Sequence, residues 1–176
     1  MITIMGATGH TGKKITEALL KAGKKVRALG RSENKLAELK RAGAEVLAGD
    51  TTDAAFLTKA FRGADAVYTL LPTDPHAPDF RGEQDRQGEA IVKAVRDSSV
   101  QYVVALSSIG ANLSEGTGVI AGLHAQEERF IGKTTGEETP DEPMPATFTE
   151  GVPAVAGTIW MIVGKRAGWP PGFGFG

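Results

Sequence analysis

The sequence predicts an α/β protein built on a doubly wound parallel sheet. Apolar segments typical of buried strands alternate with segments of helical periodicity from residue 1 to about residue 131. The segments that follow the strands are rich in glycine or polar residues. Strands that alternate with helices at this spacing are joined by right-handed crossovers, which place helices on both faces of one parallel sheet.

The first twelve residues predict a strand, a tight turn and the start of a helix. Residues 1–5 are mainly apolar and β-branched, and Gly6, Gly9 and Gly12 follow at a G-x-x-G-x-x-G spacing, with helical periodicity opening at Thr11 or Gly12. Glycine lets the backbone approach a pyrophosphate, and the helix N-terminus points unpaired N–H groups at it. A plain structural turn is the alternative. The flanking strand and helix are the context that a dinucleotide-binding fingerprint requires.

The later elements follow in order. Strands are expected at residues 24–29, 44–48, 66–71 and 100–106, and helices at residues 12–22, 33–42, 54–62 and 87–97. Ser32 and Asp53 are expected to cap two of these helices, and Gly23, Gly43 and Gly63 are natural helix ends. The run from residue 66 to 71 is nearly all apolar, as is typical of a parallel strand covered on both faces.

Ligands of open α/β sheets bind at the carboxyl ends of the strands, so the residues after each strand are the candidate binding residues. The candidates are Gly6, Thr8, Gly9, His10, Thr11 and Gly12 after the first strand, Arg31 and Lys35 after the second, Asp50 and Thr51 after the third, Leu71 and Pro72 after the fourth, and Ser107 after the fifth.

The residues after the second strand favour NADP(H) over NAD(H). NAD-binding fingerprints usually place an acidic residue there for the ribose 2′-hydroxyl, whereas this chain has Gly30 followed by Arg31. A guanidinium can pair with a 2′-phosphate, and Lys35 is a second candidate contact. Alternatively, both are solvated surface charges. Asp50 is either an acceptor for the adenine amine or an ordinary turn residue or cap.

Composition narrows the class of protein. The formal charge of −1, from 20 basic and 21 acidic residues, predicts neither nucleic-acid nor membrane-surface binding. The chain has no cysteine and no apolar run of membrane-spanning length, which favours the cytoplasm. The histidines lack metal-ligand spacing, so no metal is expected. The oligomeric state is not defined by the sequence.

Composition also changes near residue 131. The last part of the chain, residues 132–176, holds 9 of the 23 glycines and 6 of the 9 prolines. This shift predicts a first domain at residues 1–131 and a Gly/Pro-rich tail at residues 132–176. Within the tail, the apolar run Thr158–Val163 can add one strand to the sheet, whereas residues 135–145 and 170–176 are expected to lack structure.

Four stretches together resemble the NmrA-like, NAD(P)H-binding group of atypical short-chain dehydrogenases: Ile4–Gly12, Val26–Ser32, Gly49–Asp53 and Val103–Ala111. The resemblance implies a Rossmann fold that prefers NADP(H), with Arg31 at the 2′-phosphate and Leu71 and Pro72 against the adenosine half. Similar proteins include quinone and azo-compound reductases, reductases of phenylpropanoid-type substrates, and redox-sensing regulators that bind the cofactor without turnover.

The chain departs from this group in two ways. The Tyr-x-x-x-Lys pair of ordinary short-chain dehydrogenases is absent, and His124 with Glu128, one helical turn apart, stands where it is expected. His124 can act as a proton donor oriented by Glu128, or it can be a partly exposed helix histidine. The tail does not resemble the C-terminal substrate lobe of the relatives, so that lobe is apparently missing, and the tail is interpreted as a truncated or out-of-frame extension.

The function expected from these features is hydride transfer from NADPH to a quinone-like or other small acceptor. A non-catalytic module that senses NADP(H) is the alternative, and an inactive fragment of such an enzyme is a third.

Overall fold

The computed structural model describes residues 1–72, 78–108, 110–111, 118–130, 146–148 and 161–165. The strands are β1 (Ile2–Ile4), β2 (Val26–Gly30), β3 (Glu45–Ala48), β4 (Ala66–Thr69), β5 (Tyr102–Leu106), β6 (Ala146–Phe148) and β7 (Met161–Lys165). The helices are α1 (His10–Lys21), α2 (Glu33–Arg41), α3 (Ala54–Phe61), α4 (Phe80–Ser98), the 3₁₀ turn η1 (Gly118–Ile120) and α5 (Ala121–Phe130).

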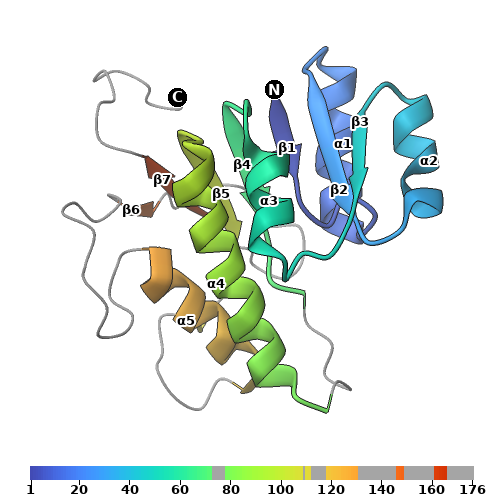
Figure 1. Ribbon diagram of the computed structural model, residues 1–176. Helices are drawn as coiled ribbons and strands as arrows, with labels where there is room; N and C mark the ends of the chain where they lie inside the picture. The colour runs from blue at the N-terminus through green and yellow to red at the C-terminus, as the bar shows by residue number, and fades with distance from the viewer. Residues whose placement is uncertain (73–77, 109, 112–117, 131–145, 149–160, 166–176) are drawn as a thin grey trace.

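Over the described residues the strands form one seven-stranded sheet in the order β3-β2-β1-β4-β5-β7-β6. The first five strands pair in parallel. Helices α1 and α2 lie on one face of the sheet, while α3 and α4 lie on the other, with α5 beside α4 (Figure 1). The doubly wound parallel sheet expected from the sequence is therefore confirmed.

The last two strands are antiparallel to their neighbours. β7 pairs with β5, matching Val104 to Val163, and β6 pairs with β7. The expected additional strand is thus present, although residues 158–160 of the predicted run lie outside the described residues. β6 was not expected. Residues 135–145 and 170–176 also lie outside the described part of the chain.

The helix ends agree with the sequence in most places. Asp53 caps α3 by accepting a hydrogen bond from the backbone N–H of Ala55 at 2.8 Å. Gly23, Gly43 and Gly63 follow their helices with positive φ angles. Ser32 occupies the N-cap position of α2 but makes no side-chain capping hydrogen bond. Ser32 therefore stands at the predicted N-cap position, but the prediction that its side chain caps the helix is wrong.

Helix α4 begins earlier than its apolar pattern indicates. The sequence predicts a start near residue 87, whereas the helix begins at Phe80. Asp79 caps it by accepting from the backbone N–H of Gly82 at 3.1 Å. The first two turns are mostly charged and exposed, so they carry no apolar stripe from which the helix could be recognised.

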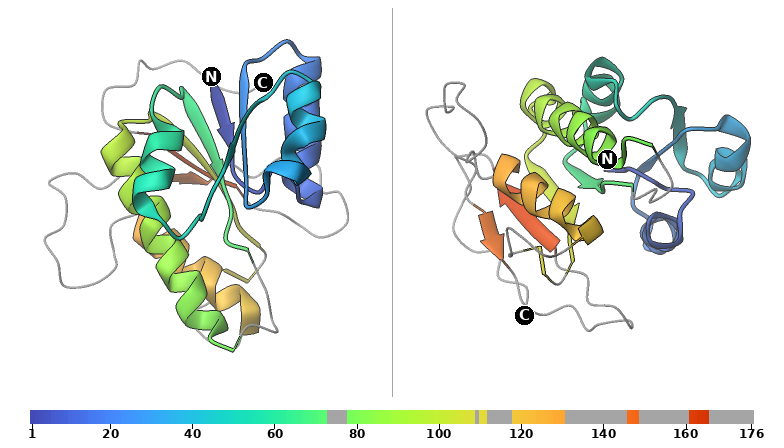
Figure 2. Two further views of the ribbon diagram at one scale, coloured as in Figure 1. Left: turned by 45° about the vertical axis from the view of Figure 1, so that its right-hand side comes forward. Right: turned by 90° about the horizontal axis from the view of Figure 1, so that it is seen from below.

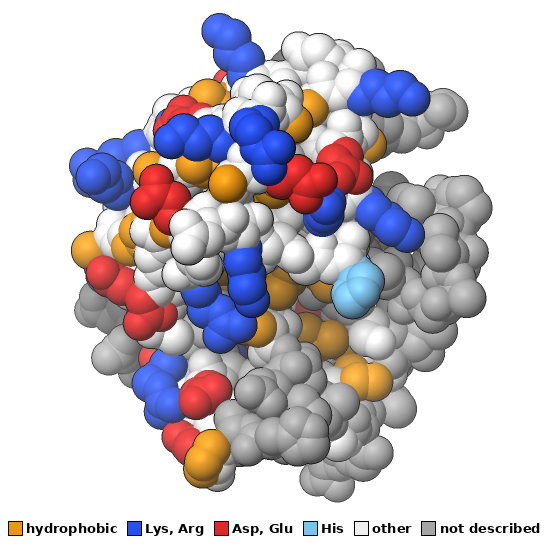
Figure 3. Space-filling model, turned by 90° about the vertical axis from the view of Figure 1, so that its right-hand side faces the viewer, with side chains coloured by type: hydrophobic (Ala, Val, Ile, Leu, Met, Phe, Trp, Pro, Cys, Tyr) orange, Lys and Arg blue, Asp and Glu red, His pale blue; other side chains and the backbone are white. Residues whose placement is uncertain are grey.

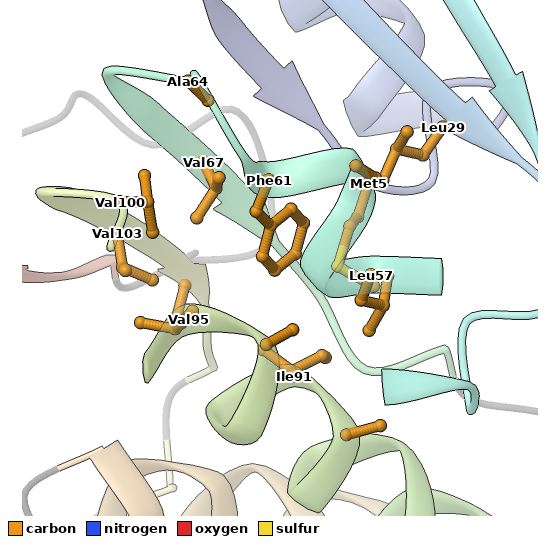
Figure 4. Close-up of a cluster of buried hydrophobic side chains, with 14 of the residues drawn as sticks. Met5, Leu29, Leu57, Phe61, Ala64, Val67, Ile91, Val95, Val100 and Val103 are labelled. Atoms are coloured by element: carbon orange, nitrogen blue, oxygen red, sulfur yellow. The ribbon is translucent and has the colours of Figure 1, made fainter. Parts of the chain in front are cut away.

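Two hydrophobic clusters, one on each face, hold the helices on the sheet. The cluster under α3 and α4 includes Met5, Leu57, Phe61, Ile91 and Val103, whose side chains point toward one another (Figure 4). The cluster on the α1 and α2 side is built around Ile4, Val26, Leu36, Leu39 and Tyr68. Because β1 contributes Ile4 to one cluster and Met5, the next residue after this strand, enters the other, both cores meet at β1.

Glycines allow α4 and α5 to pack closely. The two helices lie side by side (Figures 1 and 2). The Gln84 side chain of α4 lies against Gly122 of α5, and the Gln126 side chain of α5 lies against Gly88 of α4. Arg129 of α5 donates to Asp85 of α4 at 2.6 Å. The packing is therefore reciprocal: each helix offers a glycine to a glutamine of the other.

Candidate dinucleotide-binding site

The carboxyl ends of the five parallel strands lie along one edge of the sheet, at the bottom in Figure 1 and toward the viewer in the right-hand view of Figure 2. Every candidate binding residue of the sequence follows one of these strands. The chain reverses its direction of travel across the sheet between β1 and β4. Such a switch point is where open α/β sheets bind their ligands.

The loop after β1 has the geometry of an anion cradle. Gly6 has a φ angle of +60°, and the Gly9 N–H donates to the Gly6 carbonyl at 2.9 Å, which closes a tight turn. A Cβ at Gly12 would collide with the Gly6 carbonyl group, whose carbon lies 2.8 Å from that position. Gly6 and Gly12 therefore allow the first turn of α1 to sit directly on the loop.

The N-terminus of α1 suits a phosphate electrostatically. Its N-cap is Gly9, which supplies no side-chain oxygen, and the first turn contains no acidic residue. Thr8, Gly9 and His10 are exposed, whereas Ala7 is buried and its N–H donates to the Leu29 carbonyl at 3.0 Å. The cradle thus combines a fixed backbone with a positive helix end that has no acidic residue in its own cap or first turn. A pyrophosphate fits these residues.

The loop is also held from the neighbouring strand. Met5 N–H donates to the Tyr68 carbonyl of β4 at 2.9 Å, and Leu70 packs under Gly6, where a Cβ would lie 2.6 Å from its Cδ2 atom. Leu70 was not among the candidate residues. Its contact shows that the loop after β4 supports the glycine turn directly.

Arg31 and Asp50 lie close enough to interact electrostatically at the ends of β2 and β3. Hydrogen bonds from the Thr52 backbone and hydroxyl hold the pKa of the Asp50 carboxyl below its usual range, and the charge of Arg31 lowers it further. Both side chains are exposed, as is Lys35. The structure therefore gives Asp50 the geometry of an Asx turn, with its Oδ1 atom used by Thr52.

Thr51 and the loop after β4 connect the site to the α3–α4 side. The Thr51 hydroxyl accepts a hydrogen bond of 2.5 Å from the buried amide of Gln87 on α4. Leu71 is buried in the core, and Pro72 is exposed. Pro72 is thus on the surface at the site, whereas Leu71 acts mainly as a packing residue.

Ser107 and His124 lie at the β5 end of the same edge. Ser107 is only 5% exposed, and its hydroxyl donates to the Glu127 carboxylate of α5. The Nδ1 atom of His124 lies 2.7 Å from the Ala111 carbonyl oxygen. The structure thus ties His124 to the segment after β5, and it places Glu127 on Ser107, for which the sequence identified no partner.

Sequence reasoning missed three residues of this edge: Leu70, Gln87 and Glu127. The helical spacing of three residues between His124 and Glu127 places them on one face of α5 as readily as the spacing of four to Glu128. This spacing makes Glu127 as much a candidate site residue as Glu128, and it is the signal from which Glu127 could have been found. Gln87 offers no comparable signal, because its partner Thr51 is distant in sequence.

The surface around α2 carries charges of both signs, and Figure 3 shows Lys and Arg interspersed with Asp and Glu there. The same view shows hydrophobic side chains in a hollow below this charged region, beside a histidine. Across the part of the chain that the structure describes, no cluster of His, Asp and Glu could hold a metal ion. No helix in that part is both long and apolar enough to cross a membrane.

A parallel sheet with a glycine cradle at its switch point defines a Rossmann-type dinucleotide-binding protein. A family model described as NAD(P)H-binding matches residues 6–132, and the chain belongs to that family. An NmrA-like family domain-containing oxidoreductase of Penicillium ochrochloron is 35% identical over 138 residues, covering 74% of this chain and 41% of the relative. The resemblance to NmrA-like atypical short-chain dehydrogenases is confirmed.

Several other similar proteins are reductases by name. A (4-alkanoyl-5-oxo-2,5-dihydrofuran-3-yl)methyl phosphate reductase of Streptomyces griseus is 29% identical over 167 residues, covering 95% of this chain and 52% of the relative. The Citrobacter sp. triphenylmethane reductase complexed with NADP(H) has a TM-score of 0.60 at 26% identity, covering 73% of this chain and 44% of that one. The NADPH complex of the Escherichia coli quinone oxidoreductase QOR2 has a TM-score of 0.62 at 24% identity, covering 73% and 44% of the two chains. The chain spans about half, or less, of the length of these proteins.

Proposed function

We propose that this chain is the cofactor-binding part of an NADPH-dependent oxidoreductase that reduces a quinone-like or other small acceptor. The observation that carries the proposal is the glycine cradle beside a basic residue at the end of β2. The fingerprint position for a ribose-binding carboxylate is Gly30, and Arg31 follows it on the surface. Named relatives that reduce small molecules support this class of reaction.

The preference for NADP(H) rests on Arg31 and Lys35. Both are exposed basic residues at the start of the β2–α2 connection. In this proposal the Arg31 guanidinium binds the 2′-phosphate in two hydrogen bonds and Lys35 adds a second positive charge. Asp50 and Thr51 line the adenine side, with Pro72 against the adenosine half.

The bound nicotinamide supplies the hydride. The chain itself needs to bind the cofactor, orient the acceptor beside it and supply a proton. Tyr68 is unsuited to proton donation, since burial raises its pKa to about 12 and it lies in a core strand. His124 is the proposed donor. In this role His124 is an imidazolium whose Nδ1–H donates a hydrogen bond to the Ala111 carbonyl and whose Nε2–H is the proton to be transferred. After the transfer the neutral ring keeps its Nδ1–H on Ala111, and Glu128 is the proposed second orienting group.

A module that binds NADP(H) without turnover is the second candidate, and the missing Tyr-x-x-x-Lys pair favours it. The two functions separate in one assay, because only the oxidoreductase consumes NADPH when a simple quinone is added. The division into a binding domain at residues 1–131 and a tail at residues 132–176, and the cytoplasmic location, remain predictions of the sequence.

The cofactor proposal is tested by calorimetric titration of the chain with NADPH and NADH. We expect NADPH to bind more tightly, and Arg31→Ala to weaken NADPH binding by roughly tenfold to 100-fold, since hydrogen bonds to charged groups contribute about 1.5–3 kcal/mol. NADH binding is expected to stay within about twofold of wild type, because it lacks the 2′-phosphate.

The matched control is Lys40→Ala, an exposed basic residue in the last turn of α2. This variant is expected to bind both cofactors like the wild type. Equal losses for NADPH in Arg31→Ala and Lys40→Ala would point to a general effect of charge and contradict a specific 2′-phosphate contact.

A further inference from the structure

The hydrogen bond between Ser107 and Glu127 fixes the direction of the Ser107 hydroxyl. A serine hydroxyl has one proton to donate and two lone pairs that accept, whereas an ionised carboxylate only accepts. Ser107 therefore donates its hydroxyl hydrogen bond to Glu127. Its oxygen can then interact with a further group only as an acceptor.

The position of Ser107 determines which part of a dinucleotide it can meet. Arg31 and Asp50 follow β2 and β3, on one side of β1, while Ser107 follows β5, on the opposite side of β1. A dinucleotide that places its pyrophosphate on the α1 N-terminus spans the switch point between these two sides. With the adenosine half at Arg31, the nicotinamide nucleoside lies on the side of β4 and β5.

We infer that Glu127 is a positioning residue, which holds Ser107 as a hydrogen-bond acceptor for a hydroxyl or amide N–H of the nicotinamide nucleoside. The inference rests on the proposed cofactor function. The nucleoside offers ribose hydroxyls and a carboxamide N–H₂ group as donors, and the oxygen of the buried Ser107 has lone pairs with which to accept from one of them. Glu127 acts through Ser107 and needs no contact with the cofactor.

The site is built rather than incidental. Ser107 is 5% exposed and its partner comes from a different element, α5, twenty positions along the chain. The same helix is tied to the segment after β5 by His124 and Ala111, and to α4 by Arg129 and Asp85. Three connections therefore fix the face of α5 that presents Glu127. A directed hydroxyl is useful at a binding site, because its orientation costs nothing further when the ligand arrives.

The test compares two probes: NADPH, and adenosine 2′,5′-bisphosphate, which lacks the nicotinamide nucleoside. Calorimetry with Glu127→Ala is expected to show NADPH binding weakened by about fivefold to tenfold, the range of one ordinary hydrogen bond. Binding of adenosine 2′,5′-bisphosphate is expected to be unchanged. Glu127→Gln keeps an acceptor oxygen for Ser107, so we expect it to bind NADPH within about twofold of wild type.

Two further variants separate positioning from a general structural effect. In a Ser107→Ala background, Glu127→Ala is expected to cause no additional loss of NADPH affinity, because the two residues act as one unit. Glu89→Ala, an exposed acidic residue of α4, is the control and is expected to bind both probes like the wild type. If Glu127→Ala does not fold, Ser107→Ala with the same two probes gives the same comparison.

The outcomes are distinct. Wild-type binding of both probes, with NADPH affinity unchanged in Glu127→Ala or with equal losses for both probes, would overturn the role of Glu127 and leave the cofactor function standing. Failure of the wild type to bind either probe would overturn the proposed function, and the role of Glu127 with it.

Discussion

Tyr68 shows how a single polar atom is handled in the core of this protein. The residue is 4% exposed, and its hydroxyl is buried with no hydrogen-bond partner among the described residues. Burial disfavours the charged phenolate and raises the pKa of Tyr68 to about 12 from 10.0. The side chain therefore packs as a large hydrophobic group that carries an unsatisfied hydroxyl.

The raised pKa links stability to pH in a defined direction. Below pH 10 both the folded and the unfolded chain keep the proton, so Tyr68 contributes nothing to the pH dependence. Between about pH 10 and about pH 12 the unfolded chain loses the proton first, so the free energy of unfolding falls as the pH rises. We expect Tyr68→Phe to reduce this alkaline decline, measured by urea unfolding at a series of pH values.

The same variant removes a buried hydroxyl that has no partner in the described structure. At pH 7 its free energy of unfolding is expected to equal that of wild type or exceed it by up to about 1 kcal/mol, because no hydrogen bond is lost. Lysines titrate in the alkaline range in both proteins, so the difference between the two curves reports Tyr68. If the free energy of unfolding falls equally steeply with pH in wild type and Tyr68→Phe, Tyr68 does not cause the alkaline decline.

At the scale of elements, the contact between α4 and α5 depends on glycine. A Cβ at Gly88 would lie 2.7 Å from Nη1 of Arg129 and closer to Gln126, and a Cβ at Gly122 would lie 2.5 Å from Cδ of Gln84. Both glutamine amides are buried without hydrogen-bond partners in the described residues, so their contribution is packing. An alanine at either glycine would require the ends of these long side chains to shift within the helix contact.

We expect Gly88→Ala to lower the free energy of unfolding by about 1–2 kcal/mol. Overpacking costs about 1–3 kcal/mol, and the higher helix propensity of alanine offsets up to about 1 kcal/mol. Chemical denaturation of Gly88→Ala is compared with that of Glu89→Ala, which changes the next, exposed position of the same helix. A Gly88→Ala variant as stable as the control would show that the Gln126 and Arg129 side chains can move aside without cost.

The elements differ in how far the sequence predicts them. The succession of strands and helices along the chain from β1 to β5 can be predicted from local periodicity, because most of these elements carry their own apolar pattern. The first turns of α4 lack that pattern, and only the Asp79 cap marks their start. The antiparallel direction of β7 depends on its partner β5 and on the connection between them, which no local pattern specifies.

The candidate site divides in the same way. The glycine cradle is local in sequence, so spacing alone predicts it. The pairs Thr51–Gln87 and Ser107–Glu127 join residues that are distant in sequence and meet only after the helices dock. To predict these two pairs, one has to know which side chains of α4 and α5 face the site. The sequence determines that rotation of each helix only to within one residue.

For the whole molecule, the sheet joins two hydrophobic cores into one unit. Leu57 is fully buried in the cluster on the α3 and α4 side, and Leu36 is fully buried in the cluster on the α1 and α2 side. Because neighbouring residues of the same strands enter both clusters, neither core can lose its packing without disturbing the other.

We therefore expect Leu36→Ala and Leu57→Ala each to lower the free energy of unfolding by about 2–5 kcal/mol, the usual range for a buried leucine. Urea unfolding, followed by both circular dichroism and fluorescence, is expected to give one coincident transition with an unchanged m-value in each variant. Two separated transitions in either variant would show that the two faces unfold independently.

The contact of Leu70 with Gly6 bears on any attempt to transplant the cofactor loop into another sheet. The turn at Gly6 is shaped by its own sequence and also by the side chain of Leu70, which directly follows β4, more than sixty positions later. A chimera that receives only residues 6–12 would contain the glycines but would lack the Leu70 side chain that packs under Gly6. The transferable module is therefore discontinuous, and a successful graft has to carry Leu70 with the loop.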